Sequence, residues 1–440
     1  MDLAGWQERF DVLARRFGVP GASLAVLSDG RVEALATGVL NVATGVSATT
    51  DSLFQIGSIT KVYTATVVMR LVEQGLVTLD TPVVEILPGF RVADGEVSAH
   101  VTLRHLLAHT SGISGEPDFD AGRGDDCLER YVAACAGLAQ CHPLGAGFSY
   151  CNAGYSILGR ITERLTGSVW DTALRELLLD PAELEHTWTL PEDVIRFRAA
   201  MGHLVDGGRA VPAPLWSFPR GDGPQGLICA TATDVVGFAQ LHLTSGLAGL
   251  TEMRVPQVAV PNPHDGTYDQ WCLGWGLFDW GRPVFGHDGS TIGQSSALRV
   301  LPDAEIAVAL LANTEVFGDF CHSVYSEMLH TFTDITVPAP LAPPAVPAHV
   351  ESGRYIGVYE RPDLRLEVFL HGEGLRMRVE RIDAYAALQP PYVRELVAVA
   401  DGRFLEKPPG SNRWTSTVFT TSPDGAQYLY RGTLAFPKVL

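Results

Sequence analysis

A proline-rich segment near the C-terminal end constrains the fold of this 440-residue chain more than any other feature. Residues 338–347 contain five prolines. Proline fixes its own backbone angle and has no N–H group to donate, so such a run forms a stiff extended spacer that buries little surface. We therefore expect a domain boundary here, where a linker over residues 338–349 joins a first domain, residues 1–337, to a second, residues 350–440.

Hydrophobic periodicity in the first domain predicts strands near both of its ends and helices between them. The pair Asp29-Gly30 is typical of a hairpin turn, and strand periodicity returns only from about Trp271. The strands near the two ends can therefore pair with each other, and residues 80–265 form a mostly helical insertion. The expected elements are helices over residues 4–17, 102–108, 155–166, 234–243 and 320–332, another helix between Ser58 and Gly75, and strands over residues 22–28, 31–38, 296–301 and 306–311.

The second domain shows the alternation that is typical of antiparallel strands. Apolar residues at even positions, such as Leu366 and Val368, alternate with charged residues such as Arg365 and Glu367. Glycine-containing turns separate the runs. The pattern predicts a small antiparallel, barrel-like β-domain. Nothing in its residues indicates chemistry, so we expect it to act as a structural cap or to contribute a lid to the site.

The charge of the chain excludes several classes of partner. It has 32 basic and 50 acidic side chains, a formal net charge of −18, and no basic run. Nucleic acids and anionic lipids attract proteins mainly through positive charge, so we expect neither as a partner. No apolar run approaches the roughly 18 residues of a membrane span, and the N-terminus lacks the pattern of a signal peptide. We therefore expect a cytoplasmic protein.

Cysteine and histidine spacing argues against a disulfide framework or a metal site. The seven cysteines form an odd set with no C-x-x-C pair, which is typical of free thiols in a reducing compartment. His105 and His109 lie four residues apart, but no acidic third ligand stands at a recognised spacing, so we interpret both as structural. We expect no metal and no cofactor.

The chemistry begins with Ser58-Ile59-Thr60-Lys61, at the predicted start of a helix. A spacing of three places the serine and lysine side chains on one face. A serine hydroxyl attacks only when a base takes its proton, and a lysine serves as that base when burial lowers its pKa. Only three of the 32 basic residues are lysines, and Lys61 is the only one in the first 406 residues. Because arginine cannot give up its proton, a lysine here indicates a base.

Two further motifs follow in order, Tyr150-Cys151-Asn152 and His287-Asp288-Gly289. With Ser58 and Lys61 they match the S-x-x-K, Y-x-N and H-x-G elements of the penicillin-recognising serine enzymes. The chain thus resembles the class C β-lactamase and serine esterase family over roughly residues 5–335. Supporting stretches are residues 19–23, 103–112 and 226–234.

The resemblance implies a serine β-lactamase-like α/β (α+β) fold, an antiparallel sheet flanked by helices with an inserted helical domain, followed here by the barrel-like, lipocalin-like β-domain. It also implies that the catalytic residues are Ser58, Lys61, Tyr150, Asn152 and His287. Ser58 attacks an acyl carbon, and Lys61 and Tyr150 together move its proton, in an order that stays open. Asn152 bonds Lys61 and the substrate amide. The remaining roles are an oxyanion hole from the backbone N–H groups of Ser58 and Ser290, and substrate contacts at Asn152, His287 and Gly289.

The third motif departs from the pattern of β-lactamases and cell-wall DD-peptidases, which usually carry lysine where this chain has His287. Imidazole is a poorer anchor for a substrate carboxylate, and esterases, D-aminopeptidases and penicillin-binding-protein-type thioesterases often have histidine there. We therefore favour a cytoplasmic peptidyl thioesterase or cyclase that passes an acyl group to an amine or water. Its partner would be a small-molecule or peptidyl acyl substrate, free or on a carrier protein, in a pocket shaped by loops 112–126 and 211–226.

Four alternatives remain. An intracellular esterase and a D-amino-acid amidase or peptidase use the same residues. A β-lactamase or DD-carboxypeptidase fits the third motif less well. A non-catalytic acyl-binding sensor would have little reason to keep Ser58, Lys61, Tyr150 and Asn152 together.

Overall fold

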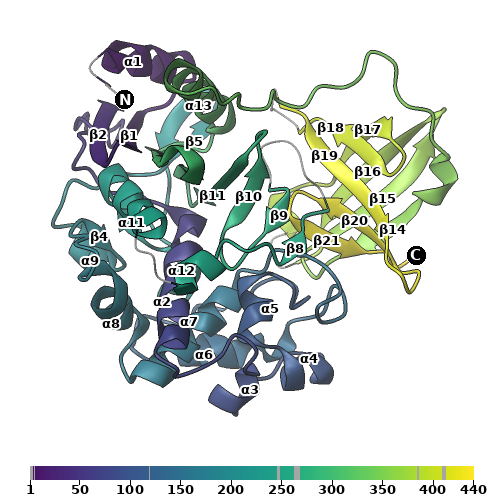
Figure 1. Ribbon diagram of the computed structural model, residues 1–440. Coiled ribbons are helices and arrows are strands. Elements are labelled where there is room, and N and C mark those ends of the chain that lie inside the picture. Colours follow the sequence, from purple (N-terminus) through teal and green to yellow (C-terminus); the bar gives the residue numbers. More distant parts are fainter. Residues whose placement is uncertain are drawn as a thin grey trace.

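The structure is a computed structural model that describes residues 3, 5–117, 119–244, 248–261, 268–383, 386–408 and 413–440. Its centre is an antiparallel sheet to which both ends of the first domain contribute (Figure 1). The strand order is β2-β1-β13-β12-β11-β10-β9-β8. The strands are β1 (Gly21–Ser28), β2 (Arg31–Gly38), β8 (Val258–Ala259), β9 (Gln270–Trp271), β10 (Gly276–Asp279), β11 (Pro283–Ser290), β12 (Ser295–Leu301) and β13 (Ile306–Ala312).

Helices cover both faces of this sheet. On one face α1 (Trp6–Arg16) and α13 (Gly318–Phe332) pack against Leu24 and Val26 of β1. On the other face α2 (Thr60–Glu73) and α11 (Ala232–Thr244) pack against Ala25 and Leu27. Because β13 is buried on both faces, its sequence is a continuous apolar run rather than an alternating one.

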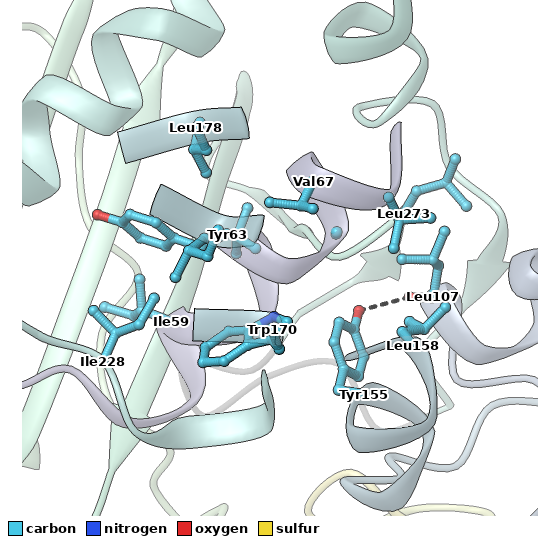
Figure 2. Packing of buried hydrophobic residues seen from close by; sticks show 14 of the residues in the cluster. Ile59, Tyr63, Val67, Leu107, Tyr155, Leu158, Trp170, Leu178, Ile228 and Leu273 are labelled. Carbon is cyan, nitrogen blue, oxygen red and sulfur yellow. Dashed lines mark hydrogen bonds between the residues drawn. The ribbon is translucent and has the colours of Figure 1, made fainter. Parts of the chain in front are cut away.

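The remaining helices are α3 (Val83–Ile86), α4 (Gly95–His100), α5 (Leu103–Leu107), α6 (Cys127–Ala134), α7 (Ala153–Thr166), α8 (Trp170–Leu174), α9 (Pro191–Val194), α10 (Gly223–Gly226) and α12 (Ala248–Glu252). Of these helices, α7, α8, α10 and α12 pack against α2. Helix α2 is buried on nearly all sides, and its buried residues include the polar Thr60, Lys61, Thr64 and Thr66. Figure 2 shows Tyr63 and Val67 of α2 among the side chains of this core, where the Tyr155 hydroxyl donates to the Leu107 carbonyl at 3.0 Å.

The C-terminal domain is a nearly closed antiparallel barrel (Figure 1). Its strands pair in chain order: β14 (Gly357–Glu360), β15 (Leu364–His371), β16 (Gly374–Arg381), β17 (Tyr392–Ala400), β18 (Arg403–Glu406), β19 (Thr415–Thr421), β20 (Gln427–Arg431) and β21 (Leu434–Pro437). Backbone bonds between Val358 and the chain end, residues 439–440, join the first strand to the last. Leu366 and Val368 point into the core, as their alternation predicts.

The predicted fold class is confirmed, with one refinement in the middle region. We expected residues 80–265 to be mostly helical. They also contain the short strands β4 (Thr187–Trp188), β5 (His203–Asp206), β6 (Arg209–Pro212), β7 (Cys229–Ala230) and β8, while β3 (Phe54–Gln55) precedes them and pairs with β7. Strand β8 and helix α11 belong to the main sheet and its covering layer, so this region is not a separate helical unit. The predicted domain boundaries stay a prediction.

No helix in the described parts of the chain is long and apolar enough to cross a membrane.

Candidate active site

Ser58 and Lys61 lie where a short 3-10 turn, Gly57–Ile59, leads into the buried helix α2. The spacing of three brings the Lys61 Nζ to 3.2 Å from the Ser58 Oγ. The same Nζ donates to the Gln225 carbonyl at 2.7 Å. Ser58 is half-buried, whereas Lys61 is completely buried. The serine is thus reachable by a substrate while its neighbouring amine is shielded from water.

Burial changes the acid-base behaviour of Lys61. Desolvation lowers the pKa of its amine to about 7, and the negative charges of Glu116 and Asp222 only partly oppose this effect. A buried ammonium is costly because the low-dielectric interior disfavours the charged form. A neutral amine, the form that can take a proton, is therefore accessible near neutral pH.

Glycine lets two segments meet at the nucleophile. Gly57 has a positive φ of 51°, and a Cβ there would lie 2.5 Å from the Ser290 backbone nitrogen. A Cβ on Gly289 would lie 1.9 Å from the Ile56 carbonyl oxygen. Only glycine at both positions permits this approach. It brings the backbone of Ser290, at the end of β11, against the turn that carries Ser58.

Tyr150 joins the pair from the segment before α7. Its ring centroid lies 5.0 Å from the Lys61 Nζ. Burial raises the pKa of Tyr150 well above its ordinary value, and the interaction of its hydroxyl with Ser58 opposes that shift only in part. In this arrangement the tyrosine hydroxyl holds its proton, and Lys61 is the group that loses one more readily.

His109 contacts the segment that carries Tyr150. Its Nδ1 accepts from the Cys151 N–H at 3.0 Å, and its ring lies 4.2 Å from that of Tyr150, centroid to centroid. The residue is buried, and burial lowers the pKa of its imidazole well below the ordinary value, so the ring is neutral. His105 instead caps helix α5 through Thr102. Both histidines therefore make structural contacts within the fold.

Asn152 makes a contact that the sequence did not predict. Its Nδ2 donates to the Glu116 Oε1, and no hydrogen bond from Asn152 to Lys61 is present among the described residues. Gln225 donates from its Nε2 to Glu116 Oε2 at 3.0 Å and to Asp222 Oδ1 at 2.8 Å. Two carboxylates from separate loops thus meet beside Lys61.

His287 is buried on β11, and its Nδ1 lies 2.6 Å from the Asp288 carbonyl oxygen. Its ring centroid is 6.3 Å from that of Tyr150. Burial, and then the charge of Lys61, lowers the pKa of its imidazole to about 3. At neutral pH this side chain carries no charge, so it differs in charge from the lysine usual at this position.

The barrel reaches the second motif. In the turn between β20 and β21 the Thr433 carbonyl accepts from the Tyr150 N–H at 3.0 Å. The preceding Ser149 side chain, completely buried, accepts from the Ala435 N–H and from Arg361, each at 3.3 Å. The β-domain thus contacts the backbone that carries Tyr150.

A cavity of about 640 Å³ adjoins the third motif at Gly289 and Ser290. Its walls come from β11, from α13, from Val337 and residues 338–341 of the proline-rich segment, and from Arg413 of the β-domain. This volume lies within the range of small-molecule pockets.

The sequence predicted the residues of three motifs, and the structure brings Ser58, Lys61, Tyr150 and His287 together. The sequence analysis did not identify Glu116, Asp222 and Gln225 as site residues. Their only signal was their position in the two loops, residues 112–126 and 211–226, that we expected to shape the pocket. A single acidic residue in a loop has no periodicity or spacing that distinguishes it from a solvated one.

A helix-flanked antiparallel sheet that holds a serine against a buried lysine defines a serine acyl-transfer enzyme of the penicillin-recognising type. The sequence matches the family model described as Beta-lactamase over residues 7–326. The chain belongs to this family and is an enzyme of its serine hydrolase and acyltransferase class.

Two similar proteins support this assignment, and a third shares the fold. Penicillin-binding protein 4 of Amycolatopsis lactamdurans is 48% identical over 373 residues, which span 82% of this chain and 98% of that protein. The crystal structure of SurE superposes with a TM-score of 0.81 at 28% identity and covers 99% of this chain and 98% of its own. D-amino acid amidase from Ochrobactrum anthropi SV3, complexed with D-phenylalanine, has a TM-score of 0.64 at 24% identity, covers 74% of this chain and 98% of its own, and shows the fold alone.

Proposed function

We propose that the protein forms an acyl-enzyme on Ser58 and passes the acyl group to an amine or to water, as a peptidyl thioesterase or cyclase of peptide natural-product biosynthesis. The observation that carries the acyl-enzyme is the buried Lys61, whose Nζ lies 3.2 Å from the Ser58 Oγ and whose pKa is about 7. We further propose a cytoplasmic location and a substrate that can be held on a carrier protein. The seven cysteines are all free, which fits a reducing compartment.

The roles of Lys61 and Tyr150 in the reaction follow from the difference between their pKa values. Lys61, in its neutral form, takes the proton of Ser58 as the Oγ bonds to the acyl carbon. The backbone N–H groups of Ser58 and Ser290 stabilise the oxyanion that forms. Tyr150 then donates a proton to the leaving group and recovers one from Lys61, because its hydroxyl is protonated and its ring lies beside Lys61. In the second half of the cycle the amine or water that accepts the acyl group gives its proton to Lys61 and Tyr150. The bond between the acyl carbon and the Ser58 Oγ then breaks, and the Oγ takes that proton back.

Hydrolysis of β-lactams or cell-wall peptides is disfavoured by His287. Those substrates carry a carboxylate that needs a cationic partner, and the imidazole of His287, with a pKa of about 3, is neutral at physiological pH. The similarity to SurE, one structure of which contains D-Leu, extends over the β-domain and supports an amino-acid or peptide acyl group.

The alternative is an esterase or a D-amino-acid amidase with water as the acceptor. Two carboxylates beside the nucleophile, those of Glu116 and Asp222, favour the amidase over the simple esterase, because an amino-acid amide carries an amine for them to bind.

Intact-protein mass spectrometry tests the proposal. The enzyme is mixed with a β-lactam, a simple ester, and a peptidyl thioester with or without an internal amine. We expect an adduct on Ser58 and rapid conversion of the amine-containing thioester to a cyclic product. Hydrolysis of the simple ester alone would favour the esterase.

The variant Ser58→Ala is expected to lose turnover by about 10⁴-fold or more, with its circular dichroism spectrum unchanged. If Ser58→Ala kept full activity, the acyl-enzyme assignment would be wrong.

A further inference from the structure

We propose that Glu116, Asp222 and the side-chain amide of Gln225 form a binding site for a primary ammonium group of the substrate. The proposal rests on the proposed function, because the site lies beside the serine that would hold the acyl group. It specifies the chemistry of the substrate further, by adding a cation that the reaction at Ser58 does not itself require.

The hydrogen bonds show that the two carboxylates belong to one site. A single amide group, Nε2 of Gln225, donates to Glu116 at 3.0 Å and to Asp222 at 2.8 Å. The backbone carbonyl of the same residue accepts from Lys61 at 2.7 Å. Asn152, of the second motif, donates to the other oxygen of Glu116. The carboxylates are therefore connected to the nucleophile by Gln225 and Lys61.

The site lacks a permanent cation. Among the described residues, Glu116 and Asp222 form no ion pair. Other acidic side chains of the same loops do: Asp125 lies 2.9 Å from Arg220. Lys61 is near, but its bonds go to the Gln225 carbonyl and to Ser58. An ammonium group of the substrate would supply the charge that the two carboxylates lack, and its three N–H donors suit several acceptors at once.

Unused acceptors at the same place give a second, independent indication. Gln225 is only 5% exposed, and its Oε1 is buried without a hydrogen-bond partner. The Oδ1 of Asn152 is buried and unpartnered in the same way. Both atoms are acceptors on amides that bond Glu116. A buried polar atom without a partner is costly, so the pattern indicates a missing donor rather than a missing acceptor.

Electrostatics agrees with this geometry. Burial, and then the charge of Glu116, raises the pKa of the Asp222 carboxyl to about 7. The charge of Lys61 opposes this shift only in part, as expected for acidic groups that are held close together and lack a direct ion pair. A bound ammonium would stabilise the ionised form of Asp222 and would relieve the repulsion between the carboxylates.

The ammonium can come from two parts of the reaction. It can be an amine on the acyl donor, such as the α-amine of an amino-acid ester, held while Ser58 attacks. It can also be the amine that accepts the acyl group. The two sources share one recognition chemistry and differ in the half-reaction that depends on the carboxylates.

The test uses the full chain and three variants. Glu116→Gln and Asp222→Asn remove one charge each and keep the shape of the side chain. Asp126→Asn removes the same charge from the same loop outside the hydrogen bonds of Asn152 and Gln225, and serves as the control. The acylation arm compares kcat/KM for D-phenylalanine methyl ester with that for its N-acetyl form. The acceptor arm starts from the N-acetyl acyl-enzyme and measures how it partitions between water and glycinamide.

We expect Glu116→Gln and Asp222→Asn to lower one of two ratios by about 10- to 100-fold, the loss typical of a charged hydrogen bond. A lower ratio of free-amine to N-acetyl ester acylation assigns the site to the acyl donor, and a lower ratio of aminolysis to hydrolysis assigns it to the acceptor. Asp126→Asn should change neither. Equal effects on charged and neutral substrates in both arms would overturn the proposal.

If the proposed function itself were wrong, the experiment would give a different result from a failure of the ammonium site alone. In that case neither ester would acylate Ser58 in the unmodified protein. Melting temperatures of all three variants separate a loss of folding from a loss of recognition. Asp222→Asn replaces a carboxyl that is costly to ionise, so we expect it to fold at least as stably as the unmodified chain.

Discussion

At the scale of single residues, the burial of Lys61 destabilises the fold and also makes its amine a base. The side chain is fully buried, and desolvation lowers the pKa of its amine to about 7. Its pKa in the unfolded chain is near 10.4, so the unfolded state binds more protons between the two values. Burial of Lys61 therefore makes the folded state less stable at pH 7 than at pH 10. The same burial leaves the amine beside Ser58 able to take a proton near neutral pH.

The pH dependence of acylation follows from that shift. Protonated Lys61 cannot accept the Ser58 proton, so kcat/KM for a neutral ester should rise with pH through about 7 and then level off. A pH–rate profile between pH 5 and 9 measures this. Lys61→Arg, which keeps the charge but cannot lose its proton, should lower kcat/KM by at least about 10³-fold.

Asp222 also titrates near pH 7, so the profile needs a control. In Asp222→Asn the rise should persist, because Lys61 remains. If the rise vanished there while activity stayed, Asp222 rather than Lys61 would be the group whose ionisation limits the rate. A flat profile in the unmodified enzyme would contradict both readings.

At the scale of elements, the site depends on how closely strand β11 approaches the 3-10 turn Gly57–Ile59. A Cβ at Gly289 would lie 1.9 Å from the Ile56 carbonyl oxygen and 2.4 Å from the Ser296 Oγ. The first of these atoms is backbone and cannot rotate away. Strand and turn would have to separate, and the N–H of Ser290 would move with the strand.

Gly289→Ala therefore tests the oxyanion hole without touching a side chain that reacts. We expect kcat/KM for acylation to fall by about 100-fold or more, the loss typical of one oxyanion donor, together with a lower melting temperature. Gly89→Ala is the matched control, because nothing lies within 4 Å of a Cβ there. An unchanged acylation rate in Gly289→Ala would exclude the Ser290 N–H as a donor.

The elements also show what the sequence could and could not predict. Strands β1 and β2 and helices α2 and α7 follow from the spacing of their apolar residues and from the turn residues that end them. Ser58 and Lys61 follow from a spacing that a helix imposes. Short strands such as β7 cannot be predicted in this way, because a strand of two residues shows no periodicity. Only its tertiary contacts make it a strand. Glu116 and Asp222 escape prediction for the same reason, since only the folded loops bring them together.

At the scale of the whole molecule, the barrel belongs to the active site through the segment that carries Tyr150. The Ser149 N–H donates to the His109 carbonyl at 2.9 Å, inside the catalytic domain. Its hydroxyl faces the other way, where it accepts from Ala435 and from Arg361 of the β-domain. Tyr150 is bonded to the β20–β21 turn through its own N–H. The position of the Tyr150 hydroxyl therefore depends on both domains, which favours a positioning role for the β-domain over that of a distant cap.

Ser149→Ala tests this dependence. The change leaves the buried Ala435 N–H without its Ser149 acceptor, while Arg361 keeps the Ala435 carbonyl as an acceptor, and a buried donor left unpaired costs about 1–3 kcal/mol of unfolding free energy. Urea unfolding measures that cost. We also expect a several-fold fall in kcat with little change in KM, because the backbone beside Tyr150 shifts. The exposed Ser47→Ala is the control. If the two variants had the same unfolding curves and rates, the contact between the domains would be irrelevant to the chemistry, and the β-domain would be a cap after all.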